Sequence, residues 1–399
     1  MQSIELFAGA GGLALGCELA GFCPQLVVEW DKWACETIRK NQMHDYPLVS
    51  NWNVFEGDVR GVDWNSITEP IDLLTGGPPC QPFSLGGKHG AFNDKRDMFP
   101  AATDAIRLLR PKAFLLENVK GLTRSSFANY YSYIQLRLTM PELVRFDNET
   151  WMEHQHRLQS EYTSVGNKDL TYQVVSTLVN AADYGIPQQR HRVFLIGFRS
   201  DVDAEFSFPS PTHSQHALSR SKSIGEYWDR HRVSKRKRPV QLDHTRLGSR
   251  EDLESFSHPW RTVRDALEGL PQPVQSESPD FLNHVLQPGA RSYPGHTGSH
   301  LDEPAKTLKA GDHGVPGGEN MLRSPDGSVR YFTVRESARL QTFPDRYEIQ
   351  GSWTEAMRQL GNAVPVLLAQ KVAGHIAEHL SAAEIREKGA LRRERRKSA

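Results

Sequence analysis

The sequence is poor in cysteine, has no long apolar run and lacks metal-binding motifs, and each of these absences excludes a class of protein. Its cysteines are Cys17, Cys23, Cys35 and Cys80, and none forms a CxxC pair. Four thiols in 399 residues do not build a disulfide framework, so we expect reduced cysteines, three of them packed as small buried hydrophobes. No apolar run reaches the roughly 20 residues of a membrane span, and no basic leader is present. With no metal-ligand spacing either, we expect an intracellular, cytoplasmic protein without a metal.

Net charge gives no sign of nucleic acid, because 48 basic residues balance 48 acidic ones. The distribution is more informative. Between Pro211 and Arg250 there are ten Lys or Arg and three acids, a local balance of +7. Such a patch attracts phosphates, although a solvated loop explains the charge equally well. The densest run is Lys235, Arg236, Lys237 and Arg238.

Short apolar runs alternate with helical patterns up to about Phe198. The expected strands are Ile4–Phe7, Leu26–Glu29, Ile71–Thr75, Ala113–Leu116, Tyr172–Leu178 and Arg192–Phe198. Helical patterns such as Gly11–Leu19 and Met98–Leu109 fall between them. The alternation predicts the α/β class, with a doubly wound, mostly parallel sheet covered on both faces. Ligands of such sheets bind beyond the carboxyl ends of the strands.

The composition changes near Ser200, where Pro, Gly, Ser, His and Arg become frequent and clear helices become few. We predict a catalytic and cofactor-binding domain over 1–199 and a smaller, loop-rich domain over 200–345. A hinge and return to the first domain follow over 346–380, and a frayed basic tail over 381–399. Residues 127–166 are expected to form a surface insertion.

The first chemical signal is the glycine-rich segment Phe7-Ala8-Gly9-Ala10-Gly11-Gly12, between an expected strand and an expected helix. Glycines let the backbone approach a ligand, and a helix N-terminus offers N–H groups. Glu29 lies about 20 residues further on, where an acid binds ribose hydroxyls. This arrangement predicts an adenosine-containing cofactor. Alone, it does not separate a nicotinamide dinucleotide from S-adenosylmethionine.

The second signal is Gly76-Gly77-Pro78-Pro79-Cys80-Gln81-Pro82-Phe83-Ser84, directly after an expected strand. Prolines restrict the backbone and hold the thiol in place, and a nearby helix N-terminus lowers a thiol pKa. A rigid, accessible cysteine at the ligand edge of a sheet indicates a nucleophile. Methyltransferases that act on amino groups have an aromatic ring after Pro-Pro, and a cysteine there argues against amino-group methylation.

Further motifs follow in order: Glu29-Trp30-Asp31, Gly57-Asp58-Val59, Glu117-Asn118-Val119, Gln188-x-Arg190-x-Arg192, Pro304–Leu308, Thr333–Asp345 and Gly361–Pro365. With the two segments above, this set resembles the DNA (cytosine-5) methyltransferase family of the prokaryotic restriction-modification type. The matched segments run from residue 4 to 365, and an ordered set is far more specific than a single glycine motif. The basic patch falls where this family has its target-recognition domain, which favours a contact with DNA phosphates.

The resemblance implies S-adenosyl-L-methionine as the cofactor and duplex DNA as the substrate. The cofactor contacts would come from Phe7, Gly9, Gly11, Gly12, Glu29, Trp30, Asp58, Val59, Pro79, Asn362, Ala363 and Val364. The DNA contacts would come from Ser84, Lys88, Gln188, Thr307 and the run Lys235, Arg236, Lys237 and Arg238.

The resemblance also assigns the catalytic residues Cys80, Glu117, Arg190 and Arg192. The thiolate of Cys80 would add to carbon 6 of a cytosine flipped out of the duplex, which makes carbon 5 electron-rich. Glu117 would hydrogen-bond or protonate ring nitrogen 3, and Arg192 would bind the cytosine carbonyl. Arg190 would hold the neighbouring DNA backbone or the active-site loop.

Three alternatives stay open from the sequence. A nicotinamide oxidoreductase accounts for the glycine-rich segment and Glu29 but leaves Gly76–Ser84 unexplained. A tRNA cytosine-5 methyltransferase would use the same scaffold, although the long basic region favours duplex DNA. A non-catalytic DNA-binding relative would lack the nucleophile, whereas Cys80 is present. We expect a monomer that modifies a short, palindromic sequence, with a possible cognate endonuclease.

Overall fold

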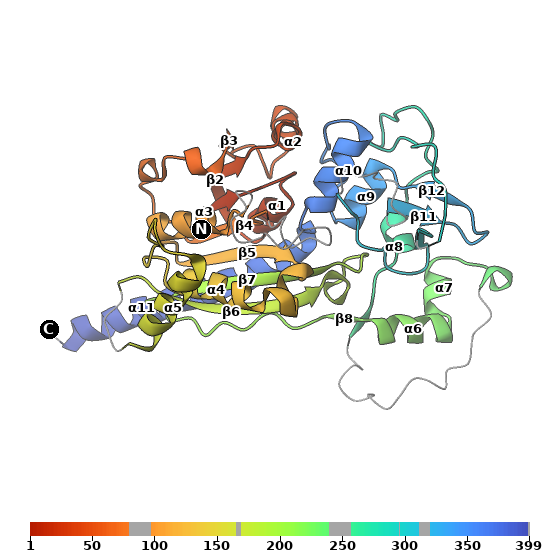
Figure 1. Ribbon diagram of the computed structural model, residues 1–399. Helices are drawn as coiled ribbons and strands as arrows, with labels where there is room; N and C mark the ends of the chain where they lie inside the picture. Colours follow the sequence, from red (N-terminus) through yellow and green to blue (C-terminus); the bar gives the residue numbers. More distant parts are fainter. Residues whose placement is uncertain (80–96, 165–168, 239–256, 295, 311–319, 398–399) are drawn as a thin grey trace. The chain divides into compact units, whose positions relative to one another are not determined.

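The computed structural model describes residues 1–79, 97–164, 169–238, 257–294, 296–310 and 320–397. The chain divides into two units (Figure 1). The first consists of Met1–Val179, His191–Pro209 and Ala369–Ala399, and the second of Asn180–Arg190 and Ser210–Leu368. The second unit therefore takes in 180–190 and extends to 368, beyond the 200–345 expected for the smaller domain.

A seven-stranded sheet forms the centre of the first unit, with the strand order β3-β2-β1-β4-β5-β7-β6 (Figure 1). Its strands are β1 (Gln2–Leu6), β2 (Cys23–Glu29), β3 (Val54–Glu56), β4 (Leu73–Gly76), β5 (Ala113–Val119), β6 (Tyr172–Asn180) and β7 (His191–Arg199). The pairs β2–β3, β1–β2, β1–β4 and β4–β5 are parallel, whereas β7 runs antiparallel to β5. The predicted α/β fold with a mostly parallel sheet is confirmed, and β3 is an additional strand.

The first unit also contains the helices α1 (Gly12–Leu19), α2 (Lys32–Met43), α3 (Phe99–Leu109), α4 (Ala128–Thr139), α5 (Trp151–Thr163) and most of α11 (Val366–Lys397). Short 3-10 turns are η1 (Val59–Gly61), η2 (Trp64–Ser66), η5 (Lys120–Thr123) and η6 (Ser125–Phe127). The start of α2 is fixed by Asp31, whose carboxylate accepts a hydrogen bond from Ala34 N at 3.0 Å. The predicted frayed tail is instead helical, because α11 continues to Lys397.

The sheet is buried on both faces. Leu73 and Leu74 are neighbours on β4 and point to opposite faces, yet both are 0% exposed. Such apolar runs are typical of a parallel strand between two helical layers. The core includes Tyr130 and Tyr133 of α4, so the segment expected to be a surface insertion contributes side chains to the main core. Cys17 and Cys35 are buried as expected, whereas Cys23 is exposed.

The second unit is built from short elements. Its helices are α6 (Gln215–Ile224), α7 (Glu226–Arg230), α8 (Val263–Leu267), α9 (Val334–Leu340) and α10 (Trp353–Asn362), with the 3-10 turns η7 (Ala181–Tyr184) and η8 (Lys235–Lys237). Its strands are β8 (His213–Ser214), β9 (His258–Pro259), β10 (Ser299–His300), β11 (Met321–Arg323) and β12 (Val329–Tyr331). A small core of Ala182, Leu218, Tyr227, Trp228 and Trp260 holds α6 and α7. In the described parts of the chain, no helix is both long and apolar enough to cross a membrane.

One buried carboxyl group lies inside the first unit. Glu5 on β1 is 2% exposed and accepts a hydrogen bond from the hydroxyl of Thr75, its partner on β4. Burial raises the pKa of Glu5 from about 4.5 to about 8. At a pH between these two pKa values, Glu5 keeps its proton in the folded protein but has lost it in the unfolded chain. The free energy of unfolding should therefore fall as the pH rises through this window.

The substitution Glu5→Gln should remove this pH dependence, because an amide stays neutral and can still accept the hydrogen bond from Thr75. We expect a gain of about 4 kcal/mol in unfolding free energy near pH 8, and little change near pH 5. Urea unfolding at several pH values measures this effect, with the exposed Glu69→Gln as the control. A parallel decline of stability with pH in wild type and Glu5→Gln would show that Glu5 is ionised in the folded protein.

Candidate active site

The turn between β1 and α1 has a backbone that favours glycine. Gly9 and Gly11 have φ values of 55° and 84°, and Phe7 also has a positive φ, of 55°. Gly11 is the N-cap of α1 and offers no side chain to cap the first N–H groups of the helix. A Cβ added at Gly9 would meet no atom within 4 Å. The turn therefore combines open space with backbone donors, as a nucleoside-binding site requires.

Glu29, at the end of β2, is held beside this turn by three backbone donors. Its Oε2 accepts a hydrogen bond from Gly9 N at 2.6 Å, and its Oε1 accepts from Trp30 N at 2.8 Å and Asp31 N at 2.7 Å. The residue is buried, and burial raises its pKa while the three donors oppose that shift. Each carboxylate oxygen has further lone pairs, so an oriented acceptor lies next to the glycine-rich turn. The adjacent Trp30 is 75% exposed.

Asp58, after β3, is engaged by its neighbour Arg60. The Arg60 Nε donates to Asp58 Oδ1 at 2.9 Å, and the backbone N of Arg60 donates to the same oxygen at 2.9 Å. These bonds lower the pKa of Asp58 to about 2, so it is a carboxylate at neutral pH. Val59 beside it is buried.

The predicted catalytic residues Glu117 and Arg192 are brought together by the sheet. Glu117 lies near the end of β5 and Arg192 near the start of the antiparallel β7, where Val119 pairs with Arg192. Arg192 Nε is 2.7 Å from Glu117 Oε1. Both side chains are largely buried, and burial lowers the pKa of Arg192 while the Glu117 charge opposes this. The result is a buried ion pair at the ligand edge of the sheet.

The backbone that leads toward Cys80 lies against this pair. A Cβ at Gly77 would be 3.3 Å from Glu117 Oε2, and the side chain of Asn118 donates to Pro78 O at 3.0 Å. Asn118 thus anchors this segment. The sequence analysis gave Asn118 no role of its own, although its position directly after Glu117 could have suggested one. Pro79 ends the described segment. Cys80, Ser84 and Lys88 lie outside the described residues, and their roles stay predictions.

Gln188 and Arg190 differ from Arg192 in their surroundings. Both are 0% exposed and belong to the second unit. Gln188 Oε1 accepts from Leu308 N at 3.1 Å, and Arg190 donates to Gly361 O at 2.7 Å. Neither side chain has exposed surface here, and the predicted DNA contact of Gln188 and the predicted catalytic contact of Arg190 stay predictions. Both are engaged with protein backbone.

The remaining predicted contacts of the second unit lie beside these residues. The hydroxyl of Thr307 donates to Gln189 O at 2.7 Å, and its side chain is partly exposed. Asn362 is exposed at the end of α10, whereas Ala363 and Val364 are buried.

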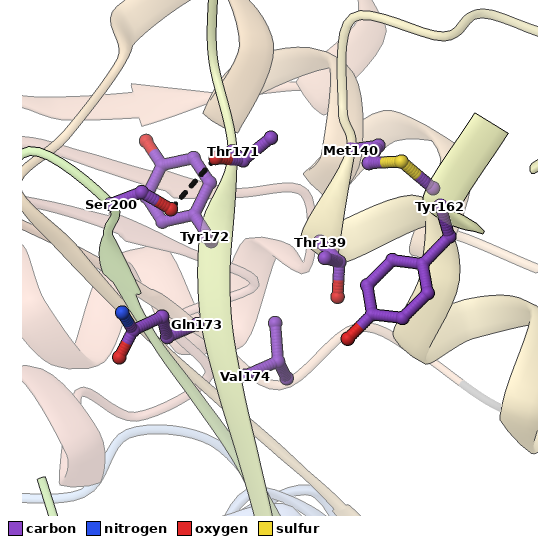
Figure 2. A pocket seen from close by; sticks show the side chains of 8 residues that line it. All are labelled: Thr139, Met140, Tyr162, Thr171, Tyr172, Gln173, Val174 and Ser200. Atoms are coloured by element: carbon purple, nitrogen blue, oxygen red, sulfur yellow. Dashed lines mark hydrogen bonds between the residues drawn. The ribbon is translucent and has the colours of Figure 1, made fainter. Parts of the chain in front are cut away.

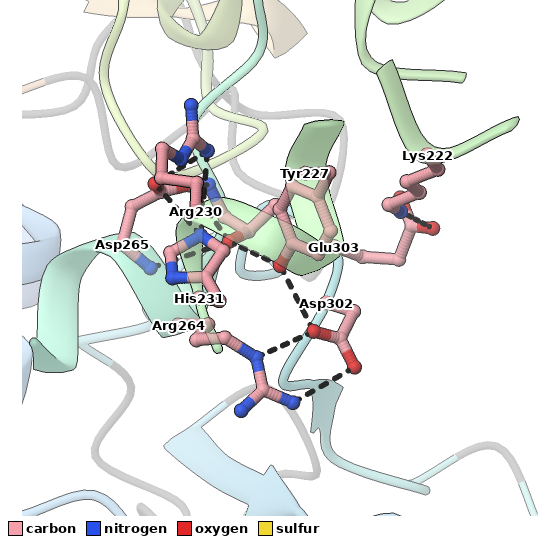
Figure 3. Close-up of polar contacts among 9 residues, drawn as sticks. Lys222, Tyr227, Arg230, His231, Arg264, Asp265, Asp302 and Glu303 are labelled. Atoms are coloured by element: carbon pink, nitrogen blue, oxygen red, sulfur yellow. Dashed lines mark hydrogen bonds and ion pairs between the residues drawn. The ribbon is translucent and has the colours of Figure 1, made fainter. Parts of the chain in front are cut away.

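The residues of the basic run differ in their exposure to solvent. Lys235, Arg236 and Lys237 form η8 and are exposed, whereas Arg238 is half-buried, pairs with Asp229 and donates to Val233 O at 3.1 Å. Three residues are thus available to phosphates, and Arg238 holds the segment. Helix α7 just before the run is joined to α8 by the ion pair Arg230–Asp265, with an N–O distance of 2.8 Å (Figure 3). The hydroxyl of Tyr227 on α7 donates to Asp302 at 2.9 Å, and Asp302 also pairs with Arg264 of α8 at 2.7 Å.

Two cavities occur within the separate units. The first, of about 430 Å³, lies in the first unit between the end of α4 and the start of β6, and is bordered by a hydrogen bond of 2.7 Å from Thr171 to Ser200 (Figure 2). The second, of about 630 Å³, lies in the second unit and includes Arg230 and Arg264. Neither is lined by a predicted site residue.

The glycine-rich turn with Glu29 fits an adenosine-containing cofactor, and the Glu117–Arg192 pair fits the predicted chemistry. Comparison with known proteins points to the same family as the motifs. The C-5 cytosine-specific DNA methylase family matches residues 1–139 and 149–378. The Type II methyltransferase M.PspPI of Psychrobacter sp. is 34% identical over 385 residues, which cover 95% of this chain and 80% of that protein. M.NgoMIV of Neisseria gonorrhoeae, also a Type II methyltransferase, is 31% identical over 95% of this chain and 97% of its own length.

Solved structures show the same fold at lower identity. The S. pombe Dnmt2 methyltransferase aligns with a TM-score of 0.53 at 18% identity, covering 96% of this chain and 99% of that one. The Entamoeba histolytica methyltransferase EhMeth aligns with a TM-score of 0.53 at 15% identity, covering 95% and 98%.

The chain therefore belongs to the C-5 cytosine-specific DNA methylase family. It is an S-adenosylmethionine-dependent enzyme that methylates carbon 5 of cytosine in DNA.

The substitution Glu29→Gln should weaken binding of S-adenosylmethionine about tenfold or more. Both carboxylate oxygens accept backbone N–H groups, so an amide NH₂ at either position would face a donor and disturb the Gly9 turn. Isothermal titration calorimetry measures the change. The control is Glu18→Gln on α1, whose carboxylate bonds Trp52 rather than this turn. Equal affinities for Glu29→Gln and wild type would exclude Glu29 from the cofactor site.

Proposed function

We propose that the protein methylates a flipped-out cytosine in a short, palindromic sequence of duplex DNA through a covalent bond to Cys80. The observation that carries this proposal is the Glu117–Arg192 pair beside the Gly77–Pro78 backbone, two residues before Cys80. A cytosine edge presents its carbonyl and ring nitrogen 3 side by side. A guanidinium and a carboxyl group 2.7 Å apart match that pattern.

Cys80 acts as the nucleophile. Its thiolate forms a bond to carbon 6, and the electron pair of the 5,6 double bond moves into the ring toward nitrogen 3. Glu117 stabilises the developing charge at nitrogen 3 by a hydrogen bond or a proton. Arg192 binds the carbonyl and holds the ring in place. Asn118 fixes the loop backbone through Pro78, which limits the positions that the thiol can take.

S-adenosylmethionine supplies an electrophilic methyl group on a sulfonium when it is bound. Glu29 would accept hydrogen bonds from the ribose hydroxyls, Asp58 would accept one from the adenine amino group, and the N–H groups of the first turn of α1 would serve as further donors. Carbon 5 would form a bond to the methyl group as the methyl–sulfur bond breaks and its electron pair stays on the departing thioether. Carbon 5 then loses its proton to solvent. The C–S bond to Cys80 breaks and returns the electron pair to the sulfur, which restores the 5,6 double bond.

We further propose a role in restriction-modification, with the protein acting as a monomer beside a cognate endonuclease. The Type II methyltransferases named above support this role, since the chain aligns with nearly the whole of M.NgoMIV.

DNA with 5-fluorocytosine at the target position should form a protein–DNA adduct that survives denaturation. The release of Cys80 requires carbon 5 to lose a proton, and a fluorine at that position cannot leave as a cation. Denaturing electrophoresis after incubation with S-adenosylmethionine measures the adduct, with 5-fluorocytosine tRNA as the competing substrate. The variant Cys80→Ser should form none, and Cys23→Ser, which changes an exposed cysteine, should behave like wild type. An undiminished adduct from Cys80→Ser would refute the assigned nucleophile, and a preference for tRNA would refute the assigned substrate.

Replacement of Lys235, Arg236 and Lys237 by Gln should flatten the salt dependence of DNA binding. Each lost phosphate contact lowers the slope of log K against log salt by about 0.9, so up to about 3 for the three residues. Fluorescence anisotropy at several salt concentrations measures the slope. The control replaces three exposed cations of α11, Lys388, Arg392 and Arg393. A slope equal to that of wild type would remove η8 from the DNA interface.

A further inference from the structure

The cavity of about 630 Å³ in the second unit is lined by four arginine side chains. They are Arg230 and Arg232, at and just after the end of α7, Arg264 of α8 and Arg330 of β12. The acidic residues that line this cavity are Glu268 and Glu336. With histidine counted as neutral, four positive charges stand against two negative ones, a balance of +2. A cavity with this charge attracts anions, and arginine suits phosphate groups in particular.

Two of these arginines are held by carboxylates that do not line the cavity. Arg264 donates to both oxygens of Asp302, from Nε at 2.7 Å and from Nη2 at 3.1 Å (Figure 3). Arg230 Nη2 donates to Asp265 Oδ1 at 2.8 Å. A guanidinium carries five N–H donors, and each of these carboxylates uses only one or two of them. The carboxylates therefore orient the two side chains and leave donors for a further acceptor.

Arg232 has a backbone conformation that favours glycine. Its φ is 53°, in the left-handed region, two residues after α7 ends at Arg230. Glycine is the usual residue where a helix ends in this conformation, because a Cβ is strained there. The Arg232 side chain is exposed and forms no hydrogen bond or ion pair with the described residues. The strained arginine thus has no partner among these residues, as is typical of a side chain retained for a ligand.

The segment after Arg232 connects the cavity with the exposed cations of η8. Val233 packs against the small core that contains Tyr227 and Trp228, and its backbone N donates to Trp228 O at 2.8 Å. Lys235 follows Arg232 by three residues, so their Cα atoms are at most about 11 Å apart. Arg232 and η8 therefore lie on one anchored stretch of chain, close enough to contact neighbouring phosphates of one DNA strand.

We propose that Arg232, together with Arg230 and Arg264, binds phosphate groups of the DNA backbone at this cavity. The inference rests on the proposed function, in which duplex DNA is the substrate, and it adds a second phosphate site to the one proposed at η8. Hydrogen bonds from a guanidinium to phosphate oxygens are charge-assisted and frequently bidentate. Such contacts position a protein on the duplex and carry no base-sequence information. The site therefore contributes to the binding of any duplex sequence.

The test compares Arg232→Gln with the wild type in the full-length protein. A fluorescently labelled duplex of arbitrary sequence is titrated at several salt concentrations, and fluorescence anisotropy measures its affinity. The slope of log K against log salt should fall by about 0.9, the value for one phosphate contact. The affinity at low salt should fall severalfold. Arg232→Lys keeps the charge, so it should keep a slope near that of wild type.

Arg232→Gly separates DNA binding from folding. Glycine relieves the strained backbone, so the Tm of this variant should equal or exceed that of wild type. Its affinity for the duplex should nevertheless fall as in Arg232→Gln. The matched control is Arg346→Gln, which removes an exposed arginine of the same unit that does not line the cavity. This control should bind the duplex with the slope of wild type.

The inference is overturned if Arg232→Gln binds the duplex with the same slope and affinity as wild type and Arg346→Gln. In that case, inorganic phosphate that binds wild type but not Arg232→Gln would assign the cavity to free phosphate. A Tm of Arg232→Gly well below that of wild type would assign Arg232 a structural role and also overturn the inference. A wild-type protein that does not bind duplex DNA would instead overturn the proposed function, and the inference with it.

Discussion

The active site depends on the parallel pairing of β1, β2, β4 and β5, because the carboxyl ends of parallel strands meet at one edge of a sheet. The glycine-rich turn, Glu29, the Gly77–Pro78 segment and Glu117 all follow or end these strands. The antiparallel β7 completes the arrangement, since it starts where β5 ends and so places Arg192 beside Glu117. Contacts such as Gly9 N to Glu29 and Asn118 to Pro78 O then follow from the topology.

Three buried carboxyl groups of the first unit differ in their hydrogen-bond donors and charged neighbours, and these differences determine what each group can do. Glu5 lies between strands with one hydroxyl donor, so burial raises its pKa and favours the neutral acid. Glu29 is met by three backbone N–H groups, which orient it as an acceptor. Glu117 pairs with a guanidinium, an arrangement that fits the proposed contact with a polar ring. A buried pair is costly to break, because the partner left behind is an uncompensated charge.

Much of this arrangement could be predicted from the sequence, because apolar runs, glycines and a Pro-rich cysteine segment are local signals. The strands before Phe7, Glu29 and Gly77 were predicted to within a few residues, and the order of motifs indicated the family. Helices α2 and α10 went unassigned, although Asp31 and Ser352 are N-cap residues that sequence inspection could have found. The antiparallel direction of β7 has no local signal, since it depends on which neighbour the strand joins.

The burial of Arg190 and Gln188 could not be predicted, because exposure depends on tertiary packing. An Arg-x-Arg pair on a strand suggests two similar side chains, yet one pairs with Glu117 and the other caps a helix more than a hundred residues away. The segment 127–166 was misassigned for a similar reason, since the tyrosines of α4 pack in the core only once the sheet exists. Polar composition alone does not predict that.

The most direct test of the central claim is the chemical identity of the methylated base. Duplex DNA incubated with the purified protein and S-adenosylmethionine can be digested to nucleosides and analysed by mass spectrometry. The account predicts 5-methylcytosine as the product, confined to one short sequence. Finding N4-methylcytosine or N6-methyladenine, with carbon 5 of cytosine unmodified, would contradict it.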